Sequence, residues 1–285
     1  MRKWLVACAA LMLAVRLCGG GGPDEAARPA RPARPGRVRI ATFNIEHFPK
    51  DARQVTGAFD EITALDADLV AAEEITDVPL FVSTARARLG ARWDFVRDPD
   101  RFEDDHHIGV LFDRDAWRLV SSTVHSETCI GRYDLPVLEV RLAPVAGGEL
   151  VRVLVVHLRP LTRGRPVRAQ QLAMLGRIAQ GARASGERVV VLGDFNATEY
   201  ADRDDLATLA RTADLQWATE DLACSAFWRR AADCPRSRLD HVLTSERPTR
   251  MEARGACATD GCAWADRCPL WATEVSDHCP VLVDF

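Results

Sequence analysis

The chain has 285 residues and a mass of 31.5 kDa, with 47% apolar and 27% charged residues. These values are typical of a soluble globular protein and exclude a disordered, collagen-like or coiled-coil chain. Residues 1–37 carry seven of the 37 basic and two of the 41 acidic residues, which leaves residues 38–285 with a formal net charge of −9. A domain this acidic does not attract polyanions through its overall field. Any phosphate substrate must be held locally.

The N-terminus has the features of an export signal. Residues 1–18 begin with Arg2 and Lys3 and continue with an apolar run over 4–15, which suits a signal peptide and is too short to span a bilayer. Cys18 could be lipidated and form a membrane tether, although Leu17 is a poor match to the small residue expected before it. Residues 19–37 are rich in Gly, Ala, Arg and Pro and predict an extended linker. We expect a secreted, periplasmic or cell-surface protein.

Seven cysteines follow the predicted signal, and six of them lie in the last 62 residues. In an exported protein such clustering favours disulfides. A zinc site is the alternative interpretation, but no CxxC pair is present. Sequence does not determine the pairing. We expect Cys224–Cys234 as a local staple, with Cys129 left as a buried thiol.

The predicted elements of residues 38–285 form one domain. Two helices are predicted by apolar stripes, one from Val55 to Leu65 and one between Arg163 and Ser185. Apolar runs predict strands at 38–44, 68–75, 107–113, 117–124, 137–142, 151–158, 188–195, 240–245 and 278–285. Strands near both ends of the chain, alternating with helices and hairpins, indicate a layered α/β domain with mixed sheet pairing.

Polar side chains recur where the predicted strands end. The residues are Asn44, Glu73, Glu74, His157, Asp194, Asn196, Asp240, Asp277 and His278. Polar groups gathered at strand ends are how α/β enzymes assemble sites. On an extended backbone Asp194 and Asn196 would face the same way. Asn, Glu and Asp oxygens suit a hard cation, so we expect Mg²⁺ with Mn²⁺ or Ca²⁺ as alternatives. A divalent ion with two histidines suits phosphate-ester hydrolysis.

Six strings give the chain a family resemblance: TFNIE (42–46), DLVAAEEI (68–75), VVHL (155–158), VLGDFNA (191–197), RLDHVL (238–243) and VSDHCP (275–280). In this order they resemble the endonuclease/exonuclease/phosphatase superfamily, which includes deoxyribonucleases, neutral sphingomyelinases, inositol polyphosphate 5-phosphatases and AP endonucleases. The resemblance covers residues 38–285. It implies a four-layer α/β sandwich of two mixed β-sheets flanked by helices.

The resemblance also implies residue roles at the ion and the phosphate. Asn44 and Glu74 resemble the metal-binding pair, and Asp277 would lie beside the ion or a second metal. His157 resembles the histidine that contacts the phosphate and assists the leaving group, while Asn196 would hold the phosphate.

Two further positions complete the implied catalytic set. Asp194 would orient or deprotonate the attacking water. His278 would be the C-terminal catalytic histidine, oriented by Asp240. Asp194 and His278 share the role of base in this assignment.

The chain departs from the family pattern at several positions. Glu73 replaces the usual Gln and is expected either to add charge at the ion or to face solvent. Asp104 or Asp105 could orient His157. AP endonucleases have Asn at the position of His157, which disfavours that branch.

Other polar and aromatic residues receive structural interpretations. His47, His106, His107, His125 and His241 are expected at the surface or behind the site. Glu46 and the pair Arg229-Arg230 are expected to be solvated. The tryptophans Trp217, Trp228, Trp264 and Trp271 are expected in the core.

The sequence therefore predicts a monomeric, divalent-metal-dependent enzyme that hydrolyses phosphodiester bonds. A secreted nuclease acting on DNA or RNA is the first interpretation. The enzymatic alternatives are a sphingomyelinase, another phospholipid hydrolase or an inositol-phosphate phosphatase. The non-enzymatic alternative is a catalytically inactive, surface-tethered binding protein on the same scaffold.

Overall fold

The computed structural model describes residues 37–100, 106–198, 200–229, 233–263 and 266–285. The predicted signal peptide, the linker up to residue 36, and Asp104, Asp105, Arg230 and Trp264 lie outside the described residues. Predictions that fall on those positions stay predictions.

The first sheet holds the strands nearest the two ends of the domain. Its order is β13 (Arg250–Ala253), β14 (Val281–Asp284), β1 (Arg39–Phe48), β2 (Leu69–Ile75), β4 (His107–Asp113) and β3 (Trp93–Arg97). β1 runs parallel to β2 and antiparallel to β14, so the sheet is mixed.

The second sheet is built from the middle of the chain. Its order is β5 (Trp117–His125), β6 (Val137–Pro144), β7 (Val151–His157), β8 (Arg188–Asp194), β12 (Asp240–Thr244) and β9 (Gln216–Trp217). β7 and β8 are parallel, and the other pairs are antiparallel. A separate short hairpin joins β10 (Ala226–Phe227) to β11 (Arg236–Ser237).

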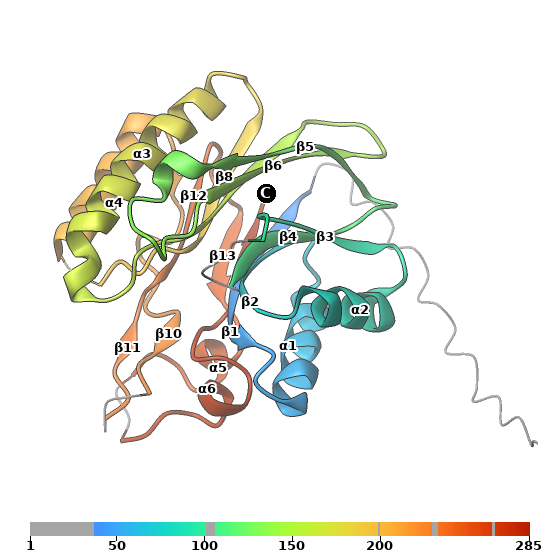
Figure 1. Cartoon of the computed structure of the whole chain (residues 1–285), viewed down its shortest axis with the longest axis vertical. Coiled ribbons are helices and arrows are strands. Elements are labelled where there is room, and N and C mark those ends of the chain that lie inside the picture. The colour runs from blue at the N-terminus through green and yellow to red at the C-terminus, as the bar shows by residue number, and fades with distance from the viewer. Residues whose placement is uncertain (1–36, 101–105, 199, 230–232, 264–265) are drawn as a thin grey trace, which may run out of the picture.

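Helices cover the outer faces of both sheets (Figure 1). α1 (Ala52–Leu65) and α2 (Val78–Leu89) pack on the first sheet, and α3 (Arg165–Arg183) and α4 (Tyr200–Ala213) pack on the second. Short helices η1 (Ser126–Thr128), η2 (Thr162–Gly164), α5 (Ala256–Thr259) and α6 (Trp271–Glu274) lie in the connections. A third apolar core fills the space between the sheets. The predicted four-layer sandwich of two mixed sheets is confirmed.

The clearly periodic elements match the predictions closely. The expected strand at 107–113 coincides with β4, and the two predicted helices are α1 and α3. The last strand starts later than expected, at Val281, because Pro280 has no backbone N–H for the sheet. α2 and α4 are the longest elements missing from the predictions. The buried stripe of α4 consists of Leu206, Leu209 and Ala213. The apolar period of this stripe is hard to recognise in the sequence because four charged residues precede it, namely Asp202, Arg203, Asp204 and Asp205.

The predicted Cys224–Cys234 disulfide is wrong. The structure pairs Cys224 with Cys262, Cys234 with Cys268, and Cys257 with Cys279. Ala226 pairs with Ser237 in the β10–β11 hairpin, so Cys224 lies at its open end and Cys234 near its turn. The two sulfurs therefore cannot meet, and each bridges to the segment after β13. Cys129 stays a thiol, but it is half-buried, and its Sγ donates to the Asp134 carbonyl at 3.3 Å.

Candidate active site

The alternation of side chains along each strand directs the polar strand ends toward the space between the sheets. On β1, Ile40 packs in the inter-sheet core while Ala41 and Phe43 pack under the helices, so Asn44 faces inward. On the second sheet, the same alternation turns His157 and Asp194 inward, after Val155 and Leu192. His157 and Asp194 are directly paired in the ladder, and so are Asp194 and Asp240. Adjacent strands therefore bring their carboxylates and imidazole together.

A tight contact at Gly193 fixes the end of β8. Gly193 has a φ of +138°, and a Cβ there would overlap the carbonyl oxygen of Val156 on the neighbouring strand. Only glycine fits this position. The GDF string thereby holds Asp194 level with His157.

Asn44 ties together carboxylates from both sheets. Its Nδ2 donates to Glu74 Oε1 at 3.0 Å and to Asp194 Oδ2 at 3.1 Å, and its Oδ1 accepts from the Glu46 backbone N–H. Glu74 reaches this position because its φ of +60° lies in a register shift between β2 and β4. Burial alone would raise the pKa of Glu74, but His157 and the Asn44 amide lower it to about 2. Glu74 is therefore ionised at neutral pH.

His157 lies between the two carboxylates of this cluster. Its Nε2 is 3.8 Å from Glu74 Oε1 and 3.6 Å from Asp194 Oδ2. Its buried Nδ1 has no hydrogen-bond partner among the described residues. The expected partners Asp104 and Asp105 lie outside those residues.

His278 and Asp240 form a buried pair on the far side of Asp194. His278 Nδ1 lies 2.9 Å from Asp240 Oδ2, and its Nε2 lies 3.7 Å from Asp194 Oδ2. Burial alone would lower the pKa of His278, but the charges of Asp240 and Asp194 raise it well above its ordinary value. Burial raises the pKa of Asp194, with His278 and His157 opposing the shift. Asp240 therefore contacts His278 Nδ1, and its role in orienting a catalytic His278 stays a prediction.

Asn196 and Asp277 line the same pocket. The structure does not keep the backbone extended at Asn196, whose φ is +50°, and its Nδ2 donates to the Leu158 carbonyl at 3.0 Å. Asp277 Oδ1 is 4.0 Å from His278 Nε2, and its Oδ2 is 3.9 Å from Arg229. The ligand roles of Asn44, Glu74 and Asp277 and the phosphate contact of Asn196 stay predictions.

Glu73 occupies neither of its two expected environments. The side chain is fully buried between the sheets, where Glu73 Oε1 accepts a 2.7 Å hydrogen bond from Thr42 Oγ1. Burial raises the pKa of Glu73 well above its ordinary value, with only partial opposition from the Thr42 hydroxyl. Alternation along β2 turns Glu73 between the sheets together with Leu69 and Ala71, whereas the positive φ of Glu74 turns that side chain back toward the pocket. Ionisation of Glu73 beneath the site is therefore disfavoured.

A charged network beside the site was not predicted. Glu46 is buried, and it accepts from Lys50 Nζ at 2.8 Å, from the Asp277 backbone N–H at 2.9 Å and from Arg229. The expectation that Glu46 and Arg229 are solvated is wrong. By strand alternation Glu46 shares the inward-facing side of β1 with Ile40 and Asn44, so it faces the pocket and not solvent.

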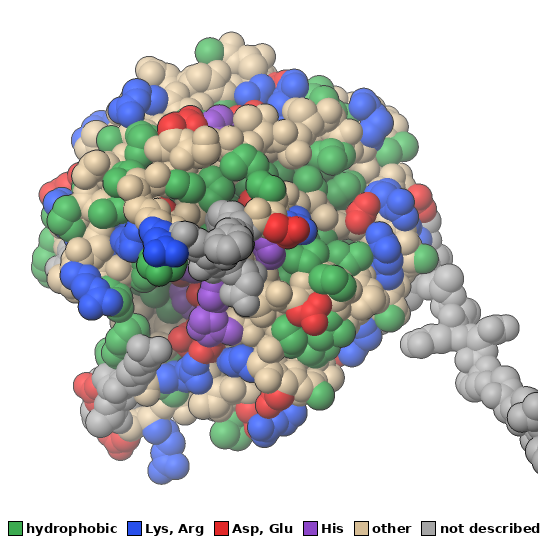
Figure 2. All heavy atoms as spheres, viewed as in Figure 1, with side chains coloured by type: hydrophobic (Ala, Val, Ile, Leu, Met, Phe, Trp, Pro, Cys, Tyr) green, Lys and Arg blue, Asp and Glu red, His purple; other side chains and the backbone are tan. Residues whose placement is uncertain are grey.

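The site opens into a pocket of about 650 Å³. Figure 2 shows histidine and acidic side chains gathered in a hollow of this face. Tyr133 and Trp228, 58% and 43% exposed, line the pocket with Arg159 and Leu161. Trp228 therefore is not a core residue, whereas Trp217 and Trp271 pack against cores.

The remaining histidines divide into two groups. His47 and His106 line the pocket, while His107, His125 and His241 do not. His107 is buried against Asp98, and His125 pairs with Glu139. Burial, aided by Arg238, lowers the pKa of His241 to about 3. His241 is thus a neutral structural histidine behind the site.

The sequence of this domain matches a known family. The sequence profile of the Endonuclease/Exonuclease/phosphatase family matches residues 41–278. The chain belongs to this family. No curated protein sequence matches it.

Solved structures of the family share the fold at low sequence identity. A humanized TDP2 from D. rerio is 16% identical with a TM-score of 0.66, and the match covers 87% of this chain and 98% of that one. The human Nocturnin catalytic domain with bound sulfate is 17% identical, with a TM-score of 0.61 and coverage of 87% and 93%. A mannosyl-6-phosphatase from Bacteroides thetaiotaomicron is 16% identical, with a TM-score of 0.63 and coverage of 86% and 98%. At these identities the likeness concerns the fold alone.

The inner cluster fits a divalent cation. Ligand atoms of Glu74, His157 and Asp194 all lie within 4.8 Å of one another. Glu74 is ionised, and the two carboxylates supply hard oxygen donors without any thiolate. The donor chemistry therefore suits a hard divalent cation such as Mg²⁺, Mn²⁺ or Ca²⁺.

Proposed function

We propose that the protein is an exported, divalent-metal-dependent hydrolase of phosphodiester bonds, with a nucleic acid as its first substrate class. The observation that carries the proposal is the convergence on one point of His157, His278 and Asp194. Both Nε2 atoms lie within 3.7 Å of Asp194 Oδ2. A single phosphate in the pocket can meet all three groups.

The protonation states favour distinct roles for Asp194 and His278. The raised pKa of His278 favours its protonated form, which suits hydrogen-bond donation to a phosphate oxygen. Asp194, with its raised pKa, is a stronger base than an ordinary carboxylate. Asp194 would take a proton from water as the water oxygen bonds to phosphorus and the P–O bond to the leaving group breaks.

His157 completes this scheme on the other side of Asp194. A proton donated from its Nε2 would neutralise the departing oxygen. When bound at Glu74, a divalent ion supplies charge neutralisation at the phosphate oxygens. Asn44 keeps Glu74 and Asp194 in place through its two amide hydrogen bonds.

The pocket rim supports a nucleic acid as substrate. Tyr133 and Trp228 present exposed aromatic rings on which bases can stack. The domain is acidic overall, so binding would depend on these rings and on the ion more than on a basic surface.

Export is supported by the disulfides. Three disulfides suit an oxidising compartment. Among the described residues, no helix is both long and apolar enough to span a bilayer. We propose that residues 1–18 direct export, that Cys18 is a candidate membrane tether, and that the domain acts as a monomer.

A substrate panel tests the proposal. The purified protein is incubated with plasmid DNA, RNA, sphingomyelin, an inositol phosphate and bis-p-nitrophenyl phosphate, each with Mg²⁺ or EDTA. We expect Mg²⁺-dependent cleavage of the nucleic acids and of the small diester. Cleavage confined to sphingomyelin or to a phosphomonoester would contradict the nucleic-acid assignment. No turnover with any substrate would favour an inactive binding protein.

A further inference from the structure

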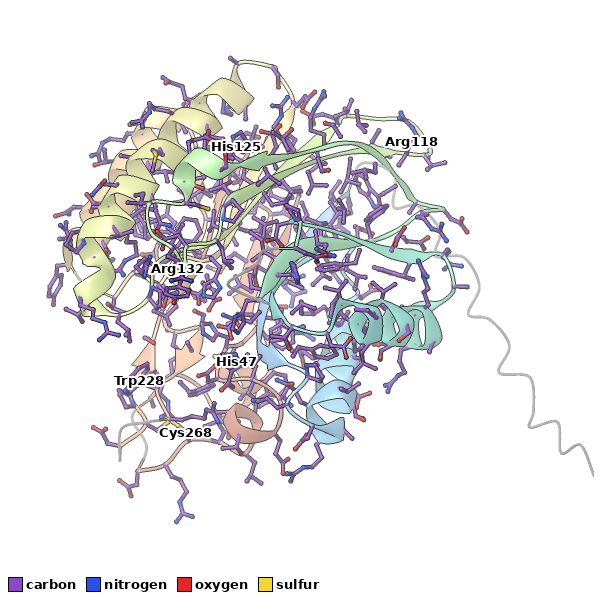
Figure 3. The ribbon with its side chains drawn as sticks, in the orientation of Figure 1. His47, Arg118, His125, Arg132, Trp228 and Cys268 are labelled. Atoms are coloured by element: carbon purple, nitrogen blue, oxygen red, sulfur yellow. A yellow bond between two sulfur atoms is a disulfide. The ribbon has the colours of Figure 1, made fainter. Side chains whose placement is uncertain are left out.

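A second group of candidate ligands lies on the outer side of Glu74. It consists of His47 near the end of β1, Glu74 on β2 and His106 just before β4, with ligand atoms all within 4.8 Å of one another. Register shifts interrupt β1–β2 between Asn44 and Phe48 and β2–β4 between Ala72 and Ile75. These irregular ends of three adjacent strands converge at the pocket. Figure 3 places His47 there, near the end of β1.

The geometry points to a second metal site, in which His47 Nδ1, His106 Nε2 and Glu74 Oε2 bind a zinc-class divalent ion. His47 Nδ1 lies 2.6 Å from His106 Nε2 and 3.7 Å from Glu74 Oε2. The His47 backbone N–H also donates to Glu74 Oε2 at 3.1 Å. The three donors therefore face a common point beside one carboxylate oxygen.

Glu74 divides its two oxygens between the inner and outer clusters. Oε1 accepts from Asn44 and faces His157, whereas Oε2 faces His47. One carboxylate thus bridges the two sites, which places two cations side by side at the pocket floor. The outer site stands independently of the proposed reaction, because it depends only on these three side chains.

The donor types select different ions at the two positions. Two imidazoles and one carboxylate suit Zn²⁺, Co²⁺ or Ni²⁺, while Mg²⁺ prefers oxygen ligands. Open catalytic zinc sites in other proteins use the same set of two His and one Glu, with a fourth position for water or substrate. His47 and His106 line the pocket, so this fourth position can take a phosphate oxygen of a bound substrate.

Only a small adjustment is needed to admit the ion. Two nitrogens bound tetrahedrally to one zinc at about 2.0–2.1 Å lie about 3.3 Å apart. The imidazole nitrogens are 2.6 Å apart, so they must separate by about 0.7 Å. The His47 side chain is 60% exposed, and its ring has room to move.

Cobalt substitution tests this site without an activity assay. The purified, metal-stripped protein is titrated with Co²⁺ in the presence of excess Mg²⁺, and visible absorption is recorded. We expect one bound Co²⁺ with visible bands and without the near-ultraviolet band of thiolate ligation. The double variant His47→Ala, His106→Ala should lose these bands. Each single variant should weaken binding by more than the roughly 10–100-fold that loss of a supporting residue costs.

Matched variants make the outcome decisive. His125→Ala removes another histidine that pairs with carboxylates, Glu127 and Glu139, away from the pocket, and should bind Co²⁺ like wild type. Glu74→Gln should lose the Co²⁺ bands as well. If a variant fails to fold, diffraction at the zinc absorption edge from wild-type crystals soaked in Zn²⁺ and Mg²⁺ should locate zinc between His47 and His106. Bands that persist in the folded double variant, or zinc absent from that position, would overturn the assignment.

Discussion

Glu73 and Glu74 show how one residue step decides the chemistry of a carboxyl group. Glu74 faces the pocket, where His157 and Asn44 lower its pKa to about 2 against the opposing effect of burial. Glu73 points between the sheets, where burial raises its pKa well above the ordinary value. The alternation of β2 turns Glu73 into the core, and the positive φ of Glu74 turns its carboxylate into the pocket, so two identical neighbours acquire opposite pKa shifts.

Glu73→Gln should change the pH dependence of stability. A carboxyl whose pKa is raised by folding costs no stability below its unfolded pKa, and it lowers stability progressively as the pH rises toward the folded pKa. A pKa raised by one unit corresponds to about 1.4 kcal/mol. Gln removes this penalty and keeps the acceptor for Thr42. The variant should therefore gain stability over wild type at about pH 7 but not at about pH 4, as measured by urea unfolding in EDTA.

Glu139→Gln provides a control of opposite sign. The hydrogen bond from His125 lowers the pKa of Glu139, so its stabilising effect is present above the unfolded pKa and is lost as the pH falls. This variant should lose stability at about pH 7 and approach wild type at about pH 4. If the unfolding free energy of Glu73→Gln instead differed from that of wild type by the same amount at both pH values, that result would show that the carboxyl group of Glu73 is not buried in the core.

The disulfide-linked segment is the element that forms one wall of the pocket. Cys224, Cys234, Cys257 and Cys279 share a small core with Phe227. The wall residues Trp228 and Arg229 follow Phe227, and His278 directly precedes Cys279. The disulfides therefore hold a segment with little regular secondary structure against the site.

Removing one disulfide should mainly change kcat, whereas removing another should mainly change KM. Cys257→Ser with Cys279→Ser releases the residue next to His278 and should lower kcat. Cys234→Ser with Cys268→Ser loosens the hairpin near Trp228 and should mainly raise KM. Each loss should cost on the order of 2–4 kcal/mol of stability. To test this, kcat and KM are measured for both variants below their melting temperatures. Equal losses of kcat in the two variants would contradict the different placement of the two disulfides relative to His278 and Trp228.

Sequence reasoning succeeded where the chain alternates regularly. Asn44, His157 and Asp194 follow buried strands, so their common inward direction could be deduced. It failed where the backbone leaves that pattern, because His47 and Asn196 have positive φ values that no apolar period reveals. The partners of Glu46, the outer histidine pair and the disulfide pairing depend on contacts between distant segments, which a single sequence does not specify.

The site exists only when the two sheets are packed together. Asn44 donates to Asp194, 150 positions away, and Ser276 Oγ donates to the Asn44 carbonyl, 232 positions away. The first sheet supplies Asn44 and Glu74, and the second supplies His157, Asp194 and Asp240. Catalysis is therefore expected to disappear together with the global fold.

We propose that His157 and His278 act on one phosphate in a folded, metal-dependent hydrolase. The most direct test is Mg²⁺-supported hydrolysis of bis-p-nitrophenyl phosphate by wild type, His157→Ala, His278→Ala and the double variant, with circular dichroism as the folding control. Each single variant should lose roughly 10²–10⁴-fold in kcat, and the double variant should lose less than the product because the residues act as a unit. Near-normal turnover by a folded double variant would show that the two histidines do not act on the phosphate.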